Sequence, residues 1–97
     1  MNNIINNEEI YEKLRNIFSN RFEMDLEAIA KENFDKHLLG SEFRLAPRDL
    51  IYIYIDIEKD FNISIPEEDV ATGGLSTINN TIKMVYRQLH KNEKASV

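Results

Sequence analysis

The stretch LAPRDLIYIYIDIEKDF, residues 45–61, decides the fold of this 97-residue chain. Its centre alternates isoleucine with polar or aromatic residues, which suits a half-buried strand that keeps all four isoleucines on one face. A helix over the same residues would instead gather one apolar stripe, made of Leu50, Ile53, Tyr54, Ile57 and Phe61. Periodicity alone does not distinguish the strand from the helix. The residues at the ends of the segment do.

The ends of this segment favour a helix over residues 47–61. Pro47 suits the first helical position, because its missing N–H would have no partner inside the helix there. Asp49 falls in the first turn, where the helix dipole stabilises an acid. The run is also about twice the length of an ordinary strand. We therefore expect a helix, with the strand as the alternative.

A second long helix is predicted over residues 7–22, where apolar residues recur at helical spacing and Glu8 and Glu9 suit the first turn. Residues 23–46 show no sustained period. We expect a long loop there, with a turn of helix near residues 26–31. Its predicted contacts with the core are Leu26, Ile29, Phe34 and either Leu38 or Leu39.

Two more helices are predicted after residue 61. Pro66 and the acids that follow it predict a short helix that ends at Gly73 and Gly74. Ser76 is the expected N-cap of the last helix. Its predicted core stripe is Ile78, Ile82, Val85, Tyr86 and Leu89. The fold class is therefore all-α: three longer helices and one short one in a four-helix bundle, with a long loop between the first two.

Composition limits the kinds of protein that the chain can be. With 97 residues, 42% of them hydrophobic, it predicts a single domain over residues 1–97, with its core at about 7–90 and a flexible tail at 92–97. A formal net charge of −5 argues against nucleic acid and anionic membranes as partners. There is no cysteine, no secretion signal and no apolar run near the ~20 residues that span a bilayer. A cytoplasmic location is the expectation.

The chain resembles an acyl carrier protein in the order of its predicted elements and in the sequence of residues 58–69, EKDFNISIPEED. In that family the second helix ends with acids and Phe, and a short link then leads to Ile-Pro and further acids. The chain is most similar to the acyl carrier-related proteins of bacterial peptide maturation systems, whose second helix also opens with PRDL and runs into an apolar, aromatic stretch and DIEK. The resemblance covers roughly residues 7–89 and implies the carrier fold.

The family's chemistry requires a serine at the start of the second helix, inside an Asp-Ser-Leu motif, that carries phosphopantetheine. Aligned without a gap from IPEED, Pro47 stands at that serine and Ala46 at the aspartate. Proline has no oxygen to esterify. The segment SEFRLAP also lengthens the loop after Gly40, and Ser41 is its only hydroxyl. The resemblance therefore implies a carrier scaffold without a cofactor, with phosphopantetheine on Ser41 as the alternative and a solvated loop serine as the plain structural explanation.

If the scaffold has no arm, its function would be docking. On a helical wheel the outward arc of residues 47–61 holds an unusual apolar group. The predicted docking residues are Arg48, Ile51, Tyr52, Ile55, Asp56 and Lys59. Carrier proteins dock on enzymes through this face largely by acids, but here Tyr52 replaces the usual glutamate and Arg44 and Arg48 add positive charge. Cover by the long loop, or by a second copy in a weak homodimer, are the alternatives to a monomeric docking protein.

No catalytic set can be assembled, because cysteine is absent and the two histidines, His37 and His90, have no acid at ligand or relay spacing. We therefore expect neither an enzyme nor a metal site. The expected partner is a biosynthetic or peptide-modifying enzyme. A genuine carrier using Ser41 and a small regulatory protein-binding module are the alternative functions. The neighbouring genes would separate the regulatory module from the docking protein.

Overall fold

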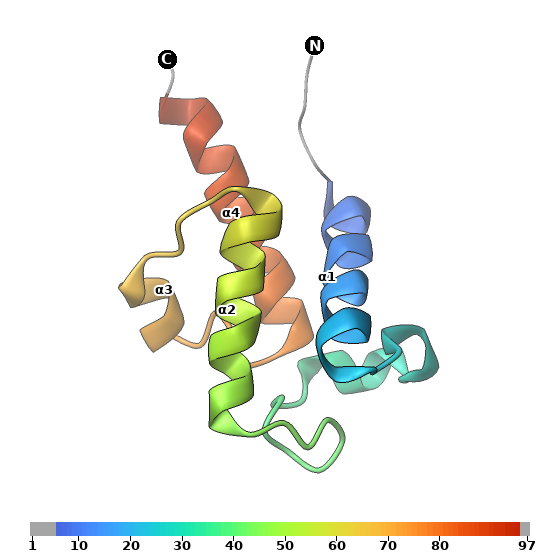
Figure 1. Ribbon diagram of the computed structural model, residues 1–97. Coiled ribbons are helices and arrows are strands. Elements are labelled where there is room, and N and C mark those ends of the chain that lie inside the picture. The colour runs from blue at the N-terminus through green and yellow to red at the C-terminus, as the bar shows by residue number, and fades with distance from the viewer. Residues whose placement is uncertain (1–5, 96–97) are drawn as a thin grey trace.

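The computed structural model describes residues 6–95, and the side chains of residues 6–91. Over these residues the chain is all-helical and contains no strand, so the strand alternative for residues 45–61 is wrong. The elements, in order, are α1 (Asn7–Phe22), the 3-10 helices η1 (Leu26–Ala28) and η2 (Lys31–Asp35), α2 (Pro47–Phe61), α3 (Glu67–Ala71) and α4 (Ile78–Ala95) (Figure 1).

The two longest predicted helices have the bounds that the sequence indicated. At the start of α1, Asn6 Oδ1 accepts a hydrogen bond from the Glu9 backbone N–H at 2.9 Å, and the Glu9 carboxylate accepts one from the Asn6 N–H. The helix ends at Glu23, whose backbone turns into the left-handed region with φ 56°. Asn62 ends α2 in the same way, with φ 55°. Both helices therefore stop where a single residue can satisfy the last carbonyls.

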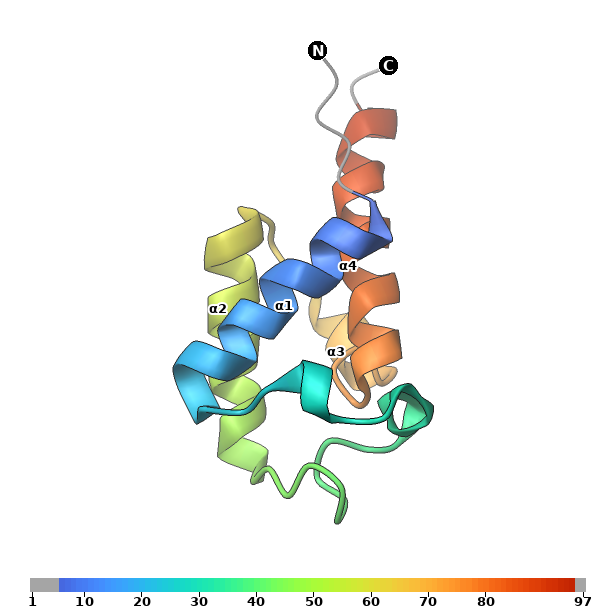
Figure 2. The same ribbon diagram turned by 90° about the vertical axis from the view of Figure 1, so that its right-hand side faces the viewer.

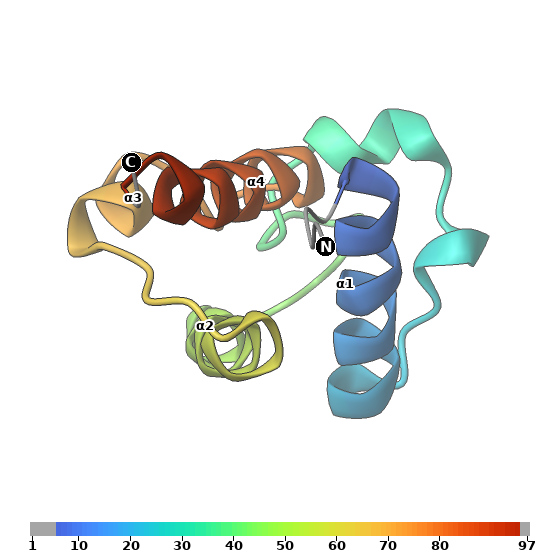
Figure 3. The same cartoon turned by 90° about the horizontal axis from the view of Figure 1, so that it is seen from above.

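The three longer helices surround a common centre, and α1 packs against both α2 and α4. Seen from above, α2 appears end-on with α1 on one side and α3 on the other (Figure 3). From the side, α1 runs obliquely across the other two helices (Figure 2). The core between them is made of aliphatic side chains and phenylalanine, with Ile10, Leu14, Phe18, Ile53, Ile57, Ile78, Met84 and Val85 almost completely buried.

The long connection from α1 to α2 is pinned to this core at several points. Two of the predicted contacts, Leu26 and Phe34, are buried, and Ile29 is half-buried. Of the two leucines that the sequence left open, Leu38 is buried and Leu39 is 39% exposed. The 3-10 helix η1 lies within the predicted helical turn near residues 26–31, and a second one, η2, follows from Lys31 to Asp35.

The segment SEFRLAP is tied down at both ends. The Leu38 N–H donates to the Ser76 carbonyl at 2.8 Å, and the Leu45 N–H donates to the Leu38 carbonyl at 3.1 Å. Phe43, between these two leucines, is buried. The apparent insertion therefore forms a closed loop that contributes an aromatic side chain to the core.

The last helix differs from its prediction in three respects. It is capped by Thr77 rather than Ser76, since the Thr77 Oγ1 accepts from the Asn80 N–H at 2.9 Å. Tyr86, predicted to be in the core stripe, is 40% exposed and stacks on His90. The helix continues to Ala95, through four of the six residues expected to form a tail, while residues 96 and 97 lie outside the described part of the chain.

Among the residues that the structure describes, no helix has both the length and the apolar character needed to cross a bilayer.

Candidate docking surface

The start of α2 is built without a hydroxyl group. Pro47 occupies the first helical turn, and Ala46 before it offers no side-chain cap. The part-buried N–H of Ala46 donates to Asp49 instead, whose Oδ2 accepts the hydrogen bond at 2.8 Å. This position therefore has a complete local structure, but it has no oxygen that could be esterified.

Ser41 lies outside α2, in the closed loop between Leu38 and Leu45. It is exposed, and its Oγ makes one long contact, 3.4 Å to the Glu42 carboxylate. Glu42 also pairs with Lys36 at 3.3 Å. The pKa of the Glu42 carboxyl group is lowered, first by a hydrogen bond from its own backbone N–H and then by the hydrogen bond from Lys36. Ser41 is thus accessible on the surface, but it does not belong to the helix start.

The outward arc of α2 is open to solvent. We define the outer stripe of α2 as Arg48, Ile51, Tyr52, Ile55 and Lys59, all of which are exposed. Its three apolar members are 57% (Ile51), 41% (Tyr52) and 49% (Ile55) exposed. α2 lies at the edge of the bundle, and no described element covers the side that faces away from α4 (Figure 3). Cover by the long loop, one of the alternatives, is therefore wrong for the described residues.

Asp56, the remaining predicted docking residue, has a different environment. It is half-buried beside the stripe. Arg21 of α1 donates to both of its carboxylate oxygens, from Nη2 to Oδ1 at 2.7 Å and from Nε to Oδ2 at 3.0 Å. The hydrogen bond to Asp56 raises the pKa of Arg21, so the guanidinium stays charged. The Arg21 guanidinium also lies 4.7 Å from the centre of the Tyr52 ring. Asp56 therefore neutralises the Arg21 guanidinium, and the same guanidinium contacts the Tyr52 ring.

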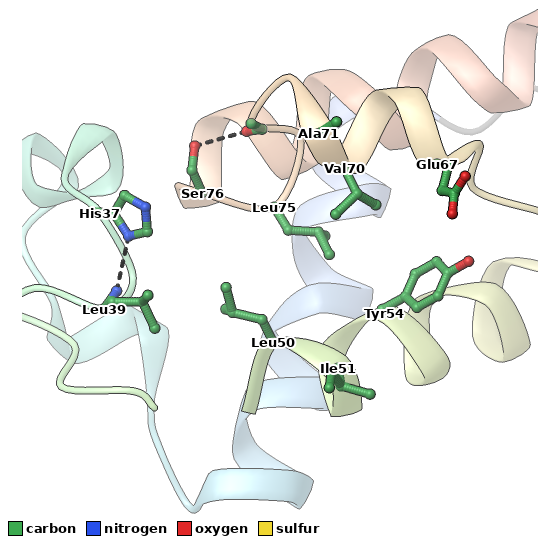
Figure 4. A pocket seen from close by; sticks show the side chains of 11 residues that line it. His37, Leu39, Leu50, Ile51, Tyr54, Glu67, Val70, Ala71, Leu75 and Ser76 are labelled. Atoms are coloured by element: carbon green, nitrogen blue, oxygen red, sulfur yellow. Dashed lines mark hydrogen bonds between the residues drawn. The ribbon is translucent and has the colours of Figure 1, made fainter. Parts of the chain in front are cut away.

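A groove of about 510 Å³ runs beside the outer stripe, between α2 and α3. Its apolar lining includes Leu39, Leu50, Ile51, Val70 and Leu75. Leu50 and Leu75 point toward each other across it, with Val70 and Tyr54 beside them (Figure 4). Ile51 belongs to both the groove and the outer stripe, so the two form one continuous apolar surface.

The wall of this groove is fixed by hydrogen bonds at the α2–α3 connection. The Glu58 carboxylate accepts from the Ile65 N–H at 2.8 Å, and the Tyr54 hydroxyl lies 3.5 Å from the Ile65 carbonyl. The negative charge of Glu58 raises the pKa of Tyr54, so this phenol remains protonated and can donate. The groove therefore exists as a formed feature of the folded chain.

The histidines make only local contacts. His37, at the end of the groove, accepts from the Leu39 N–H through Nδ1 at 3.1 Å. His90 stacks on Tyr86, with 3.9 Å between the ring centres. Within the part of the chain that the structure describes, no three histidine or acidic side chains are grouped so that they could hold a metal ion.

Sequence reasoning placed the outer stripe but missed two features of this surface. Arg21 lies in the predicted first helix, but the sequence did not indicate that it pairs with Asp56, 35 residues away, or that it lies over the Tyr52 ring. The groove combines residues from the long loop, α2 and α3, and no local pattern links those segments. Only the tertiary structure brings them together.

No protein-family model matches the chain, and no curated protein or solved structure matches it either. The resemblance to acyl carrier proteins therefore rests on the wording of residues 58–69 and on the order of the elements. The described residues form a small all-helical bundle.

Proposed function

We propose that this chain is an acyl carrier protein-related docking protein that carries no prosthetic arm. In this proposal the outer stripe of α2 binds an enzyme of a peptide-modifying or acyl-handling pathway. The chain itself has no catalytic role.

The observation that carries this proposal is the exposure of Ile51, Tyr52 and Ile55 side by side on one helix. Single exposed apolar residues are common, but a contiguous group beside an apolar groove is typical of an interaction surface. Tyrosine is also enriched among the residues that contribute most to binding. Within the described residues Tyr52 contacts the Arg21 guanidinium and Ile51 lines the groove, yet more than 40% of the surface of each of the three residues stays open to solvent.

The start of α2 supports the absence of an arm. Pro47 stands where the family resemblance requires a serine, and α2 contains neither serine nor threonine. The local capping by Asp49 completes the helix start without one. A carrier scaffold that has lost its attachment site would retain its capacity to bind partners.

Binding to the enzyme encoded beside this gene, measured by isothermal titration calorimetry, tests the docking. We expect Tyr52→Glu and Ile55→Glu to weaken it by about thirtyfold or more each, because each places a charge in the apolar centre. Tyr86→Glu is the matched control, since Tyr86 is 40% exposed on α4, and it should leave the affinity unchanged. Circular dichroism should show all three variants folded. Tight binding by both α2 variants would reject the proposal.

A genuine carrier that uses Ser41 is the second candidate, since this serine is exposed and only weakly engaged. Co-expression with a broad-specificity phosphopantetheinyl transferase, followed by intact-mass measurement, decides between the two. Our proposal expects the unmodified mass. A gain of one phosphopantetheine that is lost in Ser41→Ala would establish the carrier instead.

A further inference from the structure

The outer stripe of α2 has a charge pattern that the net charge of the chain conceals. The formal net charge is −5, yet the stripe has Arg48 at one end and Lys59 at the other. Both are exposed, and neither makes a salt bridge within the described residues. They lie about 16 Å apart along the helix axis at 1.5 Å per residue. Between them lie the apolar side chains of Ile51, Tyr52 and Ile55.

The acids of α2 do not cancel these charges. Asp49 is turned back to the Ala46 N–H, and Glu58 to the Ile65 N–H. Asp56 is neutralised by Arg21. Asp60 is exposed, but it lies about 100° around the helix from Lys59, beside the stripe rather than on it. The face that a partner meets is therefore positive at both ends and apolar in the middle.

From this pattern we infer that the outer stripe of α2 binds an amphipathic helix of a partner protein whose apolar ridge is flanked by acidic residues. This inference rests on the proposed docking function and specifies the chemistry of the partner. A straight helical ridge with side chains at i, i+3 and i+4 is complemented by the grooves of another helix. Acids at the two ends would meet Arg48 and Lys59 and set the register.

A second copy of this chain fits the stripe poorly. If two copies pack their α2 helices antiparallel, Arg48 of each meets Lys59 of the other, and parallel packing sets Arg48 against Arg48. Both arrangements place like charges together, which disfavours the homodimer. A membrane surface is also disfavoured, because the rest of this acidic chain would approach anionic lipid headgroups.

The test is a selection from a phage library of helical peptides that have a fixed apolar ridge and randomised flanking residues. Against the wild-type protein, we expect enrichment of peptides with Asp or Glu at both ends of the ridge. These peptides should bind the Arg48→Glu/Lys59→Glu variant roughly tenfold or more weakly, and binding should weaken with added salt. Lys83→Glu, an exposed lysine on α4, is the matched control and should change the affinity by no more than about twofold. No enrichment, neutral or basic peptides, or equal binding to the double variant would overturn the inference.

Two further measurements separate this inference from the proposed function. If the neighbouring enzyme loses affinity for Tyr52→Glu but keeps it for Arg48→Glu/Lys59→Glu, docking stands and the acidic partner is wrong. If it binds all of these variants, the docking function itself fails.

Sedimentation with phosphatidylserine-containing vesicles should leave the protein in the supernatant. Co-sedimentation that the double variant abolishes would assign the stripe to membranes and overturn the inference.

Discussion

The two faces of α2 contain the same side chain in opposite environments. Ile53 and Ile57 point inward and are 0% exposed, whereas Ile51 and Ile55 point outward and are 57% and 49% exposed. Burying an isoleucine contributes about 1.5–3 kcal/mol to folding, so the inner pair explains why the helix packs where it does. The outer pair contributes little of this kind. The comparison shows that hydrophobic content alone does not separate residues that hold the fold from residues available for binding.

The largest effect that tests this comparison is expected from paired alanine substitutions. Ile57→Ala should lower the free energy of unfolding by about 2–5 kcal/mol, because it leaves a cavity in the core. Ile55→Ala should stay within about 0.5 kcal/mol of wild type, since alanine is also the stronger helix former. Urea denaturation followed by circular dichroism measures both. Equal losses in the two variants would mean that the outer face also stabilises the fold.

A smaller effect is expected at the start of the helix, which supports both faces. Asp49→Ala removes the acceptor of the Ala46 N–H and an acid near the positive end of the dipole, and should destabilise by about 1 kcal/mol. The control is Asp60→Ala in the last turn, where an acid opposes the dipole. It should leave the stability unchanged or slightly higher in the same denaturation experiment. A larger loss for Asp60 than for Asp49 would contradict this account of the helix start.

The sequence was sufficient for the bounds of α1 and α2 and for which side chains of α2 point outward. The bounds Asn7–Phe22 and Pro47–Phe61 could be predicted because helical periodicity and end signals agree in both segments. The outward arc followed from the same periodicity. Local rules of this kind determine where a helix lies in the chain and how its side chains are distributed around it.

The sequence was not sufficient for what each face meets. Tyr86 has the right spacing for the core stripe of α4, but that edge of the helix is left uncovered and Tyr86 stacks on His90. Leu38 and Leu39 are adjacent and chemically identical, and the hydrogen bonds that close the loop decide which of them is buried. Arg21 and Asp56 meet only because α1 crosses α2. Such features depend on tertiary packing, which helical periodicity does not predict.

The smallest effect concerns the contact between the two helices beside the outer stripe. Arg21→Gln removes the bidentate grip on Asp56 and the cation above the Tyr52 ring. Because this pair lies at the surface and is partly exposed, the free energy of unfolding should change little. The ring protons of Tyr52 should shift in the NMR spectrum and those of Tyr86 should not. Asp56→Asn should produce the same shift. Combining the two substitutions should add little to this shift, because both disrupt the same Arg21–Asp56 contact. Independent, additive shifts would show that the position of Arg21 over the Tyr52 ring does not depend on Asp56. The environment of Tyr52 would then be set by the cation–π contact alone.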